Sequence, residues 1–375
     1  MTGILREQLA QRIHSQPTRL VLAVTGGGSR AISSLVSVAG ASRTILSAVV
    51  PYATGALVEW LGGKPDEYCS AWTARAMAMS GYLKAQQLAP DAQVCGVACT
   101  ASLASDRPKH GPHRAHMAWQ SAATTAECSI ELEKGARTRD EEEDLVCDLL
   151  LNMVAEATRL DSGLDLTMLP SESLTTACIT APLEQQDLLA GRTLCIGIGS
   201  SPSSGSPAAV FPGAFHPLHA AHREMVRIAS ELLGCGVDYE ISIANVDKPP
   251  LDFIEIDGRA RQFSANEKLW LTRAPLYVDK AALFPGATFV VGADTIARIG
   301  AVRYYRDAAA MESAIAEIAR RGCRFLVFGR QVDGVFHTLS DLGLPESLAK
   351  LCQEVPEGRF HVDLSSTELR RAARQ

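Results

Sequence analysis

The stretch GAFHPLHAAH, residues 213–222, carries three of the nine histidines of the chain at intervals of three residues. It follows an apolar run at residues 208–211, and the pattern after it is helical up to Leu233. An apolar run, a glycine turn and a helical pattern in this order predict a strand followed by a helix. His219 and His222 then share the first turn of that helix. Three interpretations of this pair are open: exposed and inert side chains, a shared zinc ion, or contacts with a phosphate group.

From residue 207 to the C-terminus, predicted strands and helices alternate. The strands are expected at residues 208–211, 239–245, 287–294 and 323–329, and further helices are expected from a capping box at residues 264–267, from Asp307 through Arg321, and from Ser365. This alternation predicts an α/β domain over residues 207–375, with a Rossmann-like, doubly wound parallel sheet and helices on both faces. Ligands of such sheets bind beyond the carboxyl ends of the strands.

Two more polar stretches are expected at that end of the sheet. Gly292-Ala-Asp294 ends one predicted strand, and SSTELR, residues 365–370, opens the last predicted helix. Each has a simple structural explanation, because Asp294 can be a turn residue and residues 365–368 a capping box. The combination with residues 213–222, in this order, is more specific than any one of the three motifs.

Together the three motifs resemble those of the nucleotidyltransferase superfamily. GAFHPLHAAH is similar to its phosphate-binding signature, Gly-x-Phe-(Asp/Asn)-Pro-x-His-x-Gly-His, with His216 in place of Asp or Asn and Ala221 in place of Gly. SSTELR resembles the second signature, Ile-Ser-Ser-Thr-x-Ile-Arg, and Gly292-Ala-Asp294 resembles a stretch of nicotinamide-nucleotide adenylyltransferases. The resemblance covers about residues 205–375 and implies an enzyme that transfers a nucleotidyl group.

The resemblance assigns roles that fit the chemistry of these side chains. Imidazole N–H groups, hydroxyls, a helix N-terminus and a bidentate guanidinium can all stabilise charge on phosphate oxygens, and Mg²⁺ bound with ATP neutralises the leaving pyrophosphate. We expect His219 and His222 to be catalytic and Lys248 and Asp294 to contact the phosphate acceptor. Lys248 can equally be a solvated loop residue. The expected nucleotide-binding residues are Gly213, Phe215, His216, Ser365, Ser366, Thr367 and Arg370.

The first part of the chain has its own α/β pattern. Apolar runs predict strands at residues 20–24, 44–50 and 93–100, and helices are expected at residues 70–88 and, with an acidic first turn, at 138–158. We therefore expect a first domain over residues 1–158. Residues 159–206, which end in the Ser- and Gly-rich stretch GSSPSSGSP, are predicted to be mainly a linker region that contains one strand at 193–199.

The first domain resembles the C-terminal domain of the CinA family, whose active members deamidate nicotinamide mononucleotide. The resemblance rests on Thr25-Gly-Gly27, Ala39-Gly-Ala-Ser42 and Val50-Pro-Tyr52. It implies that Ser42 and Tyr52 stand at hydrolytic positions, but the family's lysine is replaced by Leu57. Since a leucine neither accepts a proton nor shifts the pKa of a neighbour, we expect a degenerate, vestigial amidohydrolase site.

Residues 100–116 replace a glycine-rich loop of that family with a basic one. His110, His113 and His116 repeat the spacing of three. Gly111 and Pro112 interrupt any helix that would align these histidines, so a phosphate-binding or solvated loop is favoured over a zinc site.

The composition of the 375-residue chain narrows the class of protein. A formal charge of -6 and a pI near 5.9 argue against a nucleic-acid partner. No apolar run is long enough to span a bilayer, and the ten cysteines include no C-x-x-C pair, so we expect a cytoplasmic protein with reduced thiols and no structural metal. Small-molecule nucleotides are the expected partners, and a homo-oligomer is compatible with the composition.

The expected reaction is adenylyl transfer from ATP to nicotinamide or nicotinate mononucleotide, because both resembled families handle pyridine mononucleotides. Two alternatives are open. One is a transferase with another phosphate acceptor or with CTP, although SSTELR does not match the cytidylyltransferase pattern Arg-Thr-x-Gly-Ile-Ser-Thr. The other is a catalytically inactive nucleotide-binding sensor.

Overall fold

The computed structural model divides into two compact units. It describes residues 5–106, 110–161, 163–199, 206–246, 248–332, 335–337 and 339–359. Unit 1 comprises Met1–Gln186 and Asn245–Ile256, and unit 2 comprises Asp187–Ala244 and Asp257–Gln375. The first division falls inside the region predicted as a linker. The return of Asn245–Ile256 to unit 1 differs from the continuous second domain that the sequence predicts.

Unit 1 is built on a six-stranded mixed sheet. Its order is β2-β1-β3-β4-β5-β6, with parallel pairs among β1, β2 and β3 and antiparallel pairs from β3 to β6. The strands are β1 (Arg19–Thr25), β2 (Ile45–Val49), β3 (Val94–Ser102), β4 (His113–Ser121), β5 (Thr124–Leu132) and β6 (Leu174–Thr180). The three predicted strands are confirmed, and β4 to β6 are additional.

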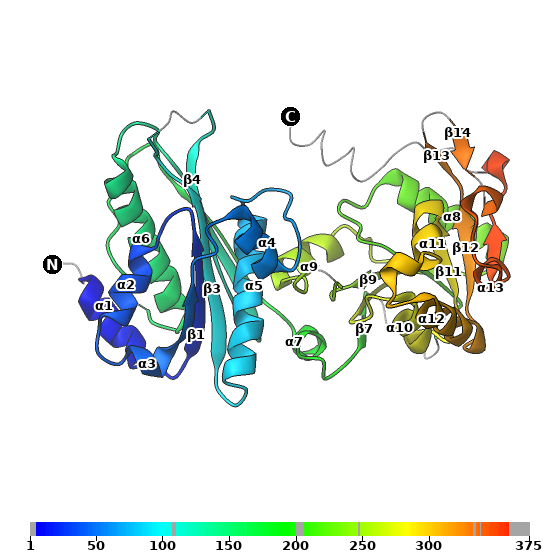
Figure 1. Ribbon diagram of the computed structural model, residues 1–375, viewed down its shortest axis with the longest axis horizontal. Helices are drawn as coiled ribbons and strands as arrows, with labels where there is room; N and C mark the ends of the chain where they lie inside the picture. The colour runs from blue at the N-terminus through cyan, green and yellow to red at the C-terminus, as the bar shows by residue number, and fades with distance from the viewer. Residues whose placement is uncertain are drawn as a thin grey trace. The chain divides into compact units, whose positions relative to one another are not determined.

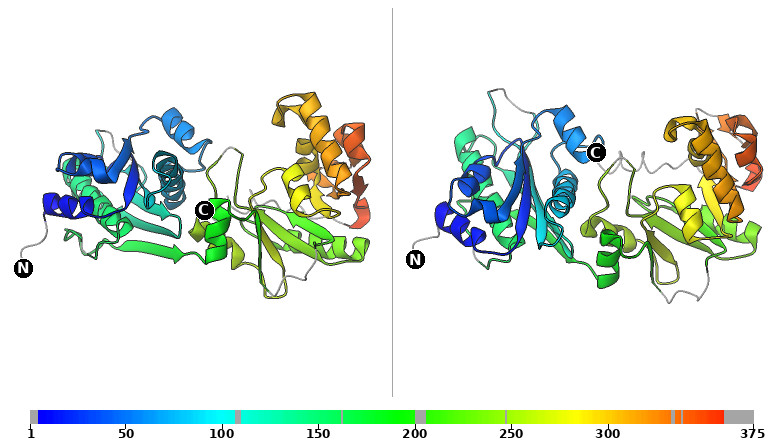
Figure 2. Two further views of the ribbon diagram at one scale, coloured as in Figure 1. Left: turned by 90° about the horizontal axis from the view of Figure 1, so that it is seen from below. Right: turned by 60° about the horizontal axis from the view of Figure 1, so that its bottom comes forward.

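Helices cover both faces of this sheet, as Figures 1 and 2 show. One face carries α1 (Arg6–His14), α2 (Arg30–Val36) and α6 (Arg139–Ala157), and the other carries α4 (Thr54–Leu61) and α5 (Ala71–Leu88). The short α3 (Ala41–Thr44) precedes β2. Helix α5 approaches β3 very closely, because a Cβ at Gly96 would lie 2.1 Å from the carbonyl oxygen of Ala78.

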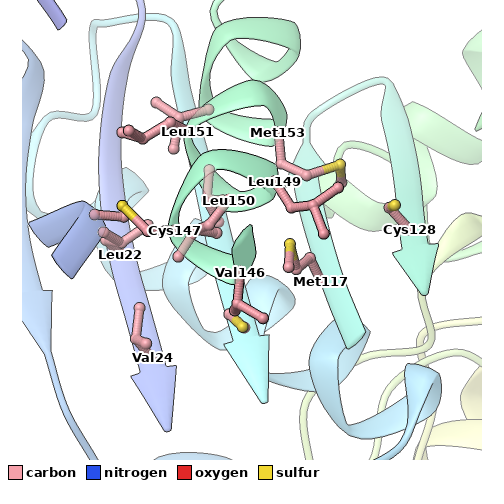
Figure 3. Packing of buried hydrophobic residues seen from close by; sticks show 14 of the residues in the cluster. Leu22, Val24, Met117, Cys128, Val146, Cys147, Leu149, Leu150, Leu151 and Met153 are labelled. Atoms are coloured by element: carbon pink, nitrogen blue, oxygen red, sulfur yellow. The ribbon is translucent and has the colours of Figure 1, made fainter. Parts of the chain in front are cut away.

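The main core of unit 1 lies between α6 and the sheet. Apolar residues recur along α6 at helical spacing and pack on the sheet, where Cys147 lies beside Leu22 of β1 (Figure 3). Burial of such apolar area is the principal stabilising contribution to the fold. A capping box at Thr138, whose hydroxyl accepts from the N–H of Glu141, begins the helix as the sequence predicts.

The acidic first turn of α6 binds neighbouring segments. The fully buried carboxylate of Glu142 accepts the N–H of Ala104 at 2.6 Å and contacts Nδ1 of His113 at 2.7 Å. Glu143 accepts the N–H of Gly28 at 2.9 Å, at the glycine turn after β1. This run of carboxylates therefore joins the loops at the carboxyl ends of β1 and β3, besides lying at the positive end of the helix.

The region predicted as a linker is largely ordered. It contains β6, then α7 (Leu183–Ala190), and then β7 (Cys195–Ile198). Strand β7 confirms the strand expected at residues 193–199, whereas β6 and α7 are additional. Strand β6 pairs with β5 in unit 1, and β7 pairs with β10 in unit 2. The sequence gives only a weak strand signal at β6 because this strand lies at a sheet edge, where burial is incomplete.

Unit 2 is built on a seven-stranded, mostly parallel sheet in the order β15-β12-β11-β8-β9-β10-β7. Strand β7 is antiparallel to its neighbour, so the sheet is mixed where the sequence predicts a parallel one. The remaining strands are β8 (Ala209–Pro212), β9 (Val237–Ser242), β10 (Leu269–Thr272), β11 (Thr288–Gly292), β12 (Arg324–Phe328) and β15 (Cys352–Glu354), and β13 (Arg330–Val332) pairs with β14 (Val335–His337).

The helices of unit 2 mostly follow the predicted alternation. They are α8 (Ala220–Leu233), α10 (Tyr277–Leu283), α11 (Ala293–Ile299), α12 (Ala308–Arg320) and α13 (Glu346–Ala349), with short 3-10 turns at Val302–Tyr304, Leu339–Leu342 and Glu357–Arg359. Helix α9 (Phe253–Ala260) begins in the segment assigned to unit 1 and ends in unit 2. Asp307 caps α12 as expected. The helix predicted from residue 264 is wrong: Ser264 and Glu267 form a turn, and strand β10 follows. In the part of the chain that the structure describes, no helix is both long and apolar enough to cross a bilayer.

The segment Asn245–Ile256 is held in unit 1 by a buried ion cluster. The guanidinium of Arg75, on α5, binds Asp252 at 2.9 Å, Glu255 at 3.2 Å and also Glu127 of β5. In addition, the N–H of Phe253 donates to the Thr125 hydroxyl at 3.0 Å. Burial raises the pKa of Asp252, against the lowering effect of Arg75. The guanidinium of Arg75 is thus shared by three carboxylates.

We predict that Arg75→Met destabilises unit 1 by about 3 kcal/mol or more, because it leaves buried carboxylates without their cation. Three of the four tryptophans, Trp60, Trp72 and Trp119, lie in unit 1, so urea unfolding followed by tryptophan fluorescence measures the effect. The control is Arg114→Met, which removes an exposed ion pair with Glu67 and should cost at most about 1 kcal/mol. Equal effects of the two substitutions would contradict the prediction.

Candidate functional site

The candidate site lies at the carboxyl ends of β8 and β11, two adjacent parallel strands of unit 2. From β8 the chain continues to β9 and β10 on one side, whereas β11 and β12 lie on the other side. This is a topological switch point, where the connections diverge and leave a crevice at the carboxyl ends of the strands. The loop after β8 carries residues 213–219, and α11 after β11 carries Asp294.

Phe215 anchors the loop after β8. Its side chain is only 2% exposed and makes edge-to-face contacts with the rings of Phe211, Tyr239, Phe263 and His222, at centroid distances of 5.3, 5.3, 5.6 and 5.1 Å. Its backbone has a φ of 45°, a left-handed conformation that is unfavourable for a residue with a side chain. Burial of the ring offsets that cost. Phe215 therefore anchors the loop through its buried ring, which leaves almost none of the side chain exposed.

Gly213 is required by the same packing. A Cβ at this position would lie 2.6 Å from the ring of Phe215, closer than a real contact allows. The N–H of Gly213 donates to the carbonyl of Glu240 on β9 at 2.9 Å. Glycine at this position thus lets the loop turn tightly over the end of the sheet.

His219 and His222 lie together at the start of α8. Their rings stack with centroids 3.6 Å apart and planes at 23°, and His219 is the N-cap residue of the helix. The N–H of His219 donates to Nδ1 of His222 at 3.3 Å. Since Nδ1 accepts, a neutral His222 carries its hydrogen on Nε2, which makes this atom a hydrogen-bond donor.

Both imidazoles are neutral near pH 7. The pKa of His222 is lowered to about 4, mainly by burial and in addition by the neighbouring His219 and Arg223. Burial also lowers the pKa of His219. The site therefore offers imidazole N–H donors and the N–H groups and positive dipole end of the 14-residue helix α8, without an imidazolium charge. Such groups stabilise an oxyanion or a phosphate.

The structure places the other predicted residues in different positions. The side chain of His216 is exposed in the loop, and Asp294 is exposed in the first turn of α11. Lys248 belongs to unit 1, where its Nζ lies 5.6 Å from the ring centroid of Trp72. Ser365, Ser366, Thr367 and Arg370 lie outside the described residues.

The predicted vestigial site in unit 1 has little of a catalytic arrangement. Ser42 is exposed on α3, and Tyr52 is 70% exposed. Leu57, at the position of the family's lysine, is 3% exposed and packs in an apolar cluster that includes Leu61 and Met77. A lysine at that position would have to bury its charge in this apolar cluster.

The histidines of the basic loop do not converge. His113 and His116 both belong to β4, and their spacing of three places them on opposite faces of the sheet. His113 contacts Glu142, whereas Nδ1 of His116 lies 2.7 Å from the Ser129 hydroxyl. Among the residues that the structure describes, no group of three or more His, Cys, Asp or Glu side chains could hold a metal ion.

Sequence reasoning missed the residues that hold the loop from the side. Gln262 binds main-chain groups of Phe215 and Leu218, and Arg259 donates to the carbonyl of Ala214 at 2.9 Å. Both lie more than 40 residues after the loop and belong to no motif. Arg259 lies at the end of α9 and Gln262 in the turn that follows, and only the fold of the chain brings this segment to the loop.

Comparisons with known proteins match part of the chain. No protein-family model and no curated protein matches it. Among solved structures, competence/damage inducible protein CihA from Agrobacterium tumefaciens is similar over 42% of this chain and 100% of its own, with 20% identity and a TM-score of 0.34. A competence-damaged protein (CinA) superfamily member from Escherichia coli is similar over 41% of this chain and 88% of its own, with 18% identity and a TM-score of 0.31. One from Klebsiella pneumoniae is similar over 41% and 96%, with 14% identity and a TM-score of 0.33.

We predict that His222 stays neutral in the folded protein at pH values well below 6.5, because its pKa is lowered to about 4. Between pH 6.5 and about 4 the unfolded chain binds a proton that the folded chain does not, so this residue makes stability fall as the pH falls through that window. The measurement is an NMR titration of the imidazole signals, assigned by their loss in His222→Phe. The urea-unfolded chain, with a pKa near 6.5, is the control. A folded-state pKa of 6.5 or above would contradict the burial argument.

Proposed function

We propose that unit 2 transfers the adenylyl group of MgATP to the phosphate of nicotinamide or nicotinate mononucleotide. The products are a dinucleotide and pyrophosphate. The observation that carries the proposal is the stacked pair His219 and His222 at the N-terminus of α8, at the switch point between β8 and β11. The strand order, Rossmann-like with an added antiparallel edge strand, is the architecture in which this position binds nucleotides.

The proposed reaction needs charge stabilisation more than covalent catalysis. A phosphate oxygen of the acceptor forms a bond to the α-phosphorus of ATP, and the bond from that phosphorus to the oxygen bridging the β-phosphate breaks. Pyrophosphate leaves with the bridging oxygen and its electron pair. Negative charge develops on phosphate oxygens, where preorganised N–H donors are most effective. Mg²⁺ enters as part of the MgATP substrate.

The described residues supply donors of this kind. Nε2–H of His222 and the N-terminal N–H groups of α8 form a fixed set of donors, because ring stacking and the buried Phe215 hold the histidines in place. We assign the triphosphate to this set and propose that Arg370, with Ser365, Ser366 and Thr367, completes its binding. Asp294, at the start of α11, is the proposed contact of the acceptor in unit 2.

The choice of acceptor rests on the resemblance of residues 20–158 to a family that handles nicotinamide mononucleotide. It is an inference from the pairing of two domain types, weaker than the inference from the site. A panel of phosphate acceptors, assayed with MgATP for pyrophosphate release, tests it directly. Turnover with another acceptor alone would keep adenylyl transfer and replace the acceptor.

We predict that His222→Phe lowers the rate of dinucleotide formation at least about a hundredfold, the scale for loss of one preorganised donor. Phenylalanine keeps the ring contacts with Phe211 and Phe215 but removes the N–H donor. The matched control is Arg227→Ala, on the exposed part of the same helix, which should keep wild-type turnover. Wild-type turnover by His222→Phe would exclude this histidine from the mechanism.

For unit 1, we propose a mononucleotide-binding or structural role without deamidase activity. The buried, apolar position of Leu57 and the exposure of Ser42 and Tyr52 support this, since a hydroxyl becomes a good nucleophile only when a neighbouring group accepts its proton or lowers its pKa, and a leucine does neither. We therefore expect unit 1 either to bind a mononucleotide without hydrolysing it or to have a purely structural role.

We predict that the full chain releases no ammonia from nicotinamide mononucleotide at rates near the enzyme median of about 10 per second. Leu57→Lys should lower the melting temperature rather than create activity, because it places a charge in an apolar cluster. Ammonia release is followed by a coupled assay, and calorimetry with the same ligand separates binding from its absence. Rapid ammonia release by the wild-type chain would overturn the proposal for unit 1.

A further inference from the structure

One side chain outside the motifs holds the loop that carries the histidine pair. Oε1 of Gln262 accepts the N–H of Leu218 at 2.7 Å, and its Nε2 donates to the carbonyl of Phe215 at 3.0 Å. Nε2 also lies 3.3 Å from the carbonyl of Arg259, in the preceding turn. A single carboxamide thus binds both ends of the segment 215–218.

The same residue also contacts the helix on the far side of the pair. The main-chain carbonyl of Gln262 accepts from Nη2 of Arg223 at 2.9 Å. Leu218 directly precedes His219, and Arg223 directly follows His222. Gln262 is therefore hydrogen-bonded immediately before and immediately after the segment that carries both imidazoles. Arg223 also forms an ion pair with Glu267 at 3.0 Å. Residues 259–267 therefore contact both the loop and the first turn of α8.

The contacts are specific for a carboxamide. The N–H of Leu218 needs an acceptor and the carbonyl of Phe215 needs a donor, and of the uncharged side chains of this length only glutamine supplies both from one planar group. A glutamate would keep the acceptor and set a negative oxygen against the carbonyl of Phe215. A methionine has a similar length and offers neither a good donor nor a good acceptor.

The two hydrogen bonds of the Gln262 carboxamide, to Phe215 and Leu218, are here called the clamp. The clamp acts on Phe215, whose backbone is in the left-handed region. Phe215 has a left-handed φ of 45°, and its ring is held by packing, whereas its carbonyl direction is held by Gln262. Ring packing holds the side chain of Phe215, and the hydrogen bonds of Gln262 restrain the main-chain groups of Phe215 and Leu218. Gln262 therefore restrains the segment that leads into α8.

We propose that Gln262 is a positioning residue for the histidine pair, which acts on the proposed adenylyl transfer by fixing His219 and His222 against the triphosphate. The inference rests on the proposed function for its effect on catalysis. Its structural part, that Gln262 fixes the loop, stands on the contacts alone. Small misplacements of a preorganised group cost on the order of a hundredfold in rate.

The test compares Gln262→Met and Gln262→Glu with the wild-type full chain. The control is Gln186→Met, which removes a glutamine that donates to the carbonyl of Ala181 at 2.8 Å in unit 1. Two readouts are used: NMR hydrogen exchange of the Leu218 amide with the imidazole signals of His219 and His222, and kcat and KM for MgATP.

We expect Gln262→Met to speed exchange of the Leu218 amide at least about tenfold and to move the imidazole signals, because the acceptor is lost. Gln262→Glu should retain much of the amide protection but still move the signals. In both variants kcat should fall about ten- to a hundredfold with little change in KM, since the lost effect concerns the transition state. The control should match the wild type in both readouts.

The outcomes separate the two claims. Unchanged exchange and unchanged imidazole signals in Gln262→Met overturn the clamp, whatever the activity. Changed signals with wild-type kcat overturn the positioning role. If the wild-type chain forms no dinucleotide with any acceptor, the proposed function falls, and the inference is then decided by the exchange and imidazole readouts alone.

Discussion

The burial of one aromatic ring in the loop after β8 is the constraint on which the candidate site depends. Phe215 adopts a backbone conformation that a non-glycine residue rarely adopts, and the contacts of its ring with Phe211, Tyr239 and Phe263 compensate for it. The ring in turn requires Gly213 to lack a side chain and supports His222 from below. The phenylalanine of the motif is therefore a packing anchor, while the histidines are the groups to which we assign the proposed phosphate contacts.

The electrostatic character of the site follows from the same burial. Since burial lowers the pKa of both His219 and His222, the proposed attraction for a phosphate rests on oriented N–H dipoles at the start of α8 and not on imidazolium charge. Fixed dipoles in a partly buried site are effective because they need no reorganisation when charge develops. Such dipoles must be accurately oriented to be effective. The hydrogen bonds of Gln262 to Leu218 and Arg223, on both sides of the pair, contribute to this orientation.

Unit 1 uses its charged residues largely for internal connections. Glu142 and Glu143 bind the loops at the ends of β3 and β1. Arg75 binds three carboxylates, of which Asp252 and Glu255 belong to Asn245–Ile256. Buried charges of this kind are costly unless each is paired, so the loss of one partner affects the whole group. Lys248, which the sequence places near an acceptor, follows this segment into unit 1.

The elements with strong apolar periodicity and clear caps could be predicted from local residue patterns. Strands β1, β3, β11 and β12, the long helices α5 and α6, and the start of α12 at Asp307 were all predictable, because apolar spacing and capping are local properties. The sequence also determined that the loop after β8 carries two histidines on one helical turn. The edge strand β6 could not be predicted in the same way, since its partner β5 lies elsewhere in the chain.

Which residues lie together at the site depends on the tertiary structure. In the folded chain the ring of Phe215 is buried, and Asn245–Ile256 belongs to unit 1. Residues 264–267, predicted as a capping box, form the turn before β10. The fold also brings Gln262 to the loop across more than 40 residues of sequence. The physical reason is that burial and long-range hydrogen bonds depend on which segments become neighbours, and local residue patterns carry no information about neighbours that are distant in the chain.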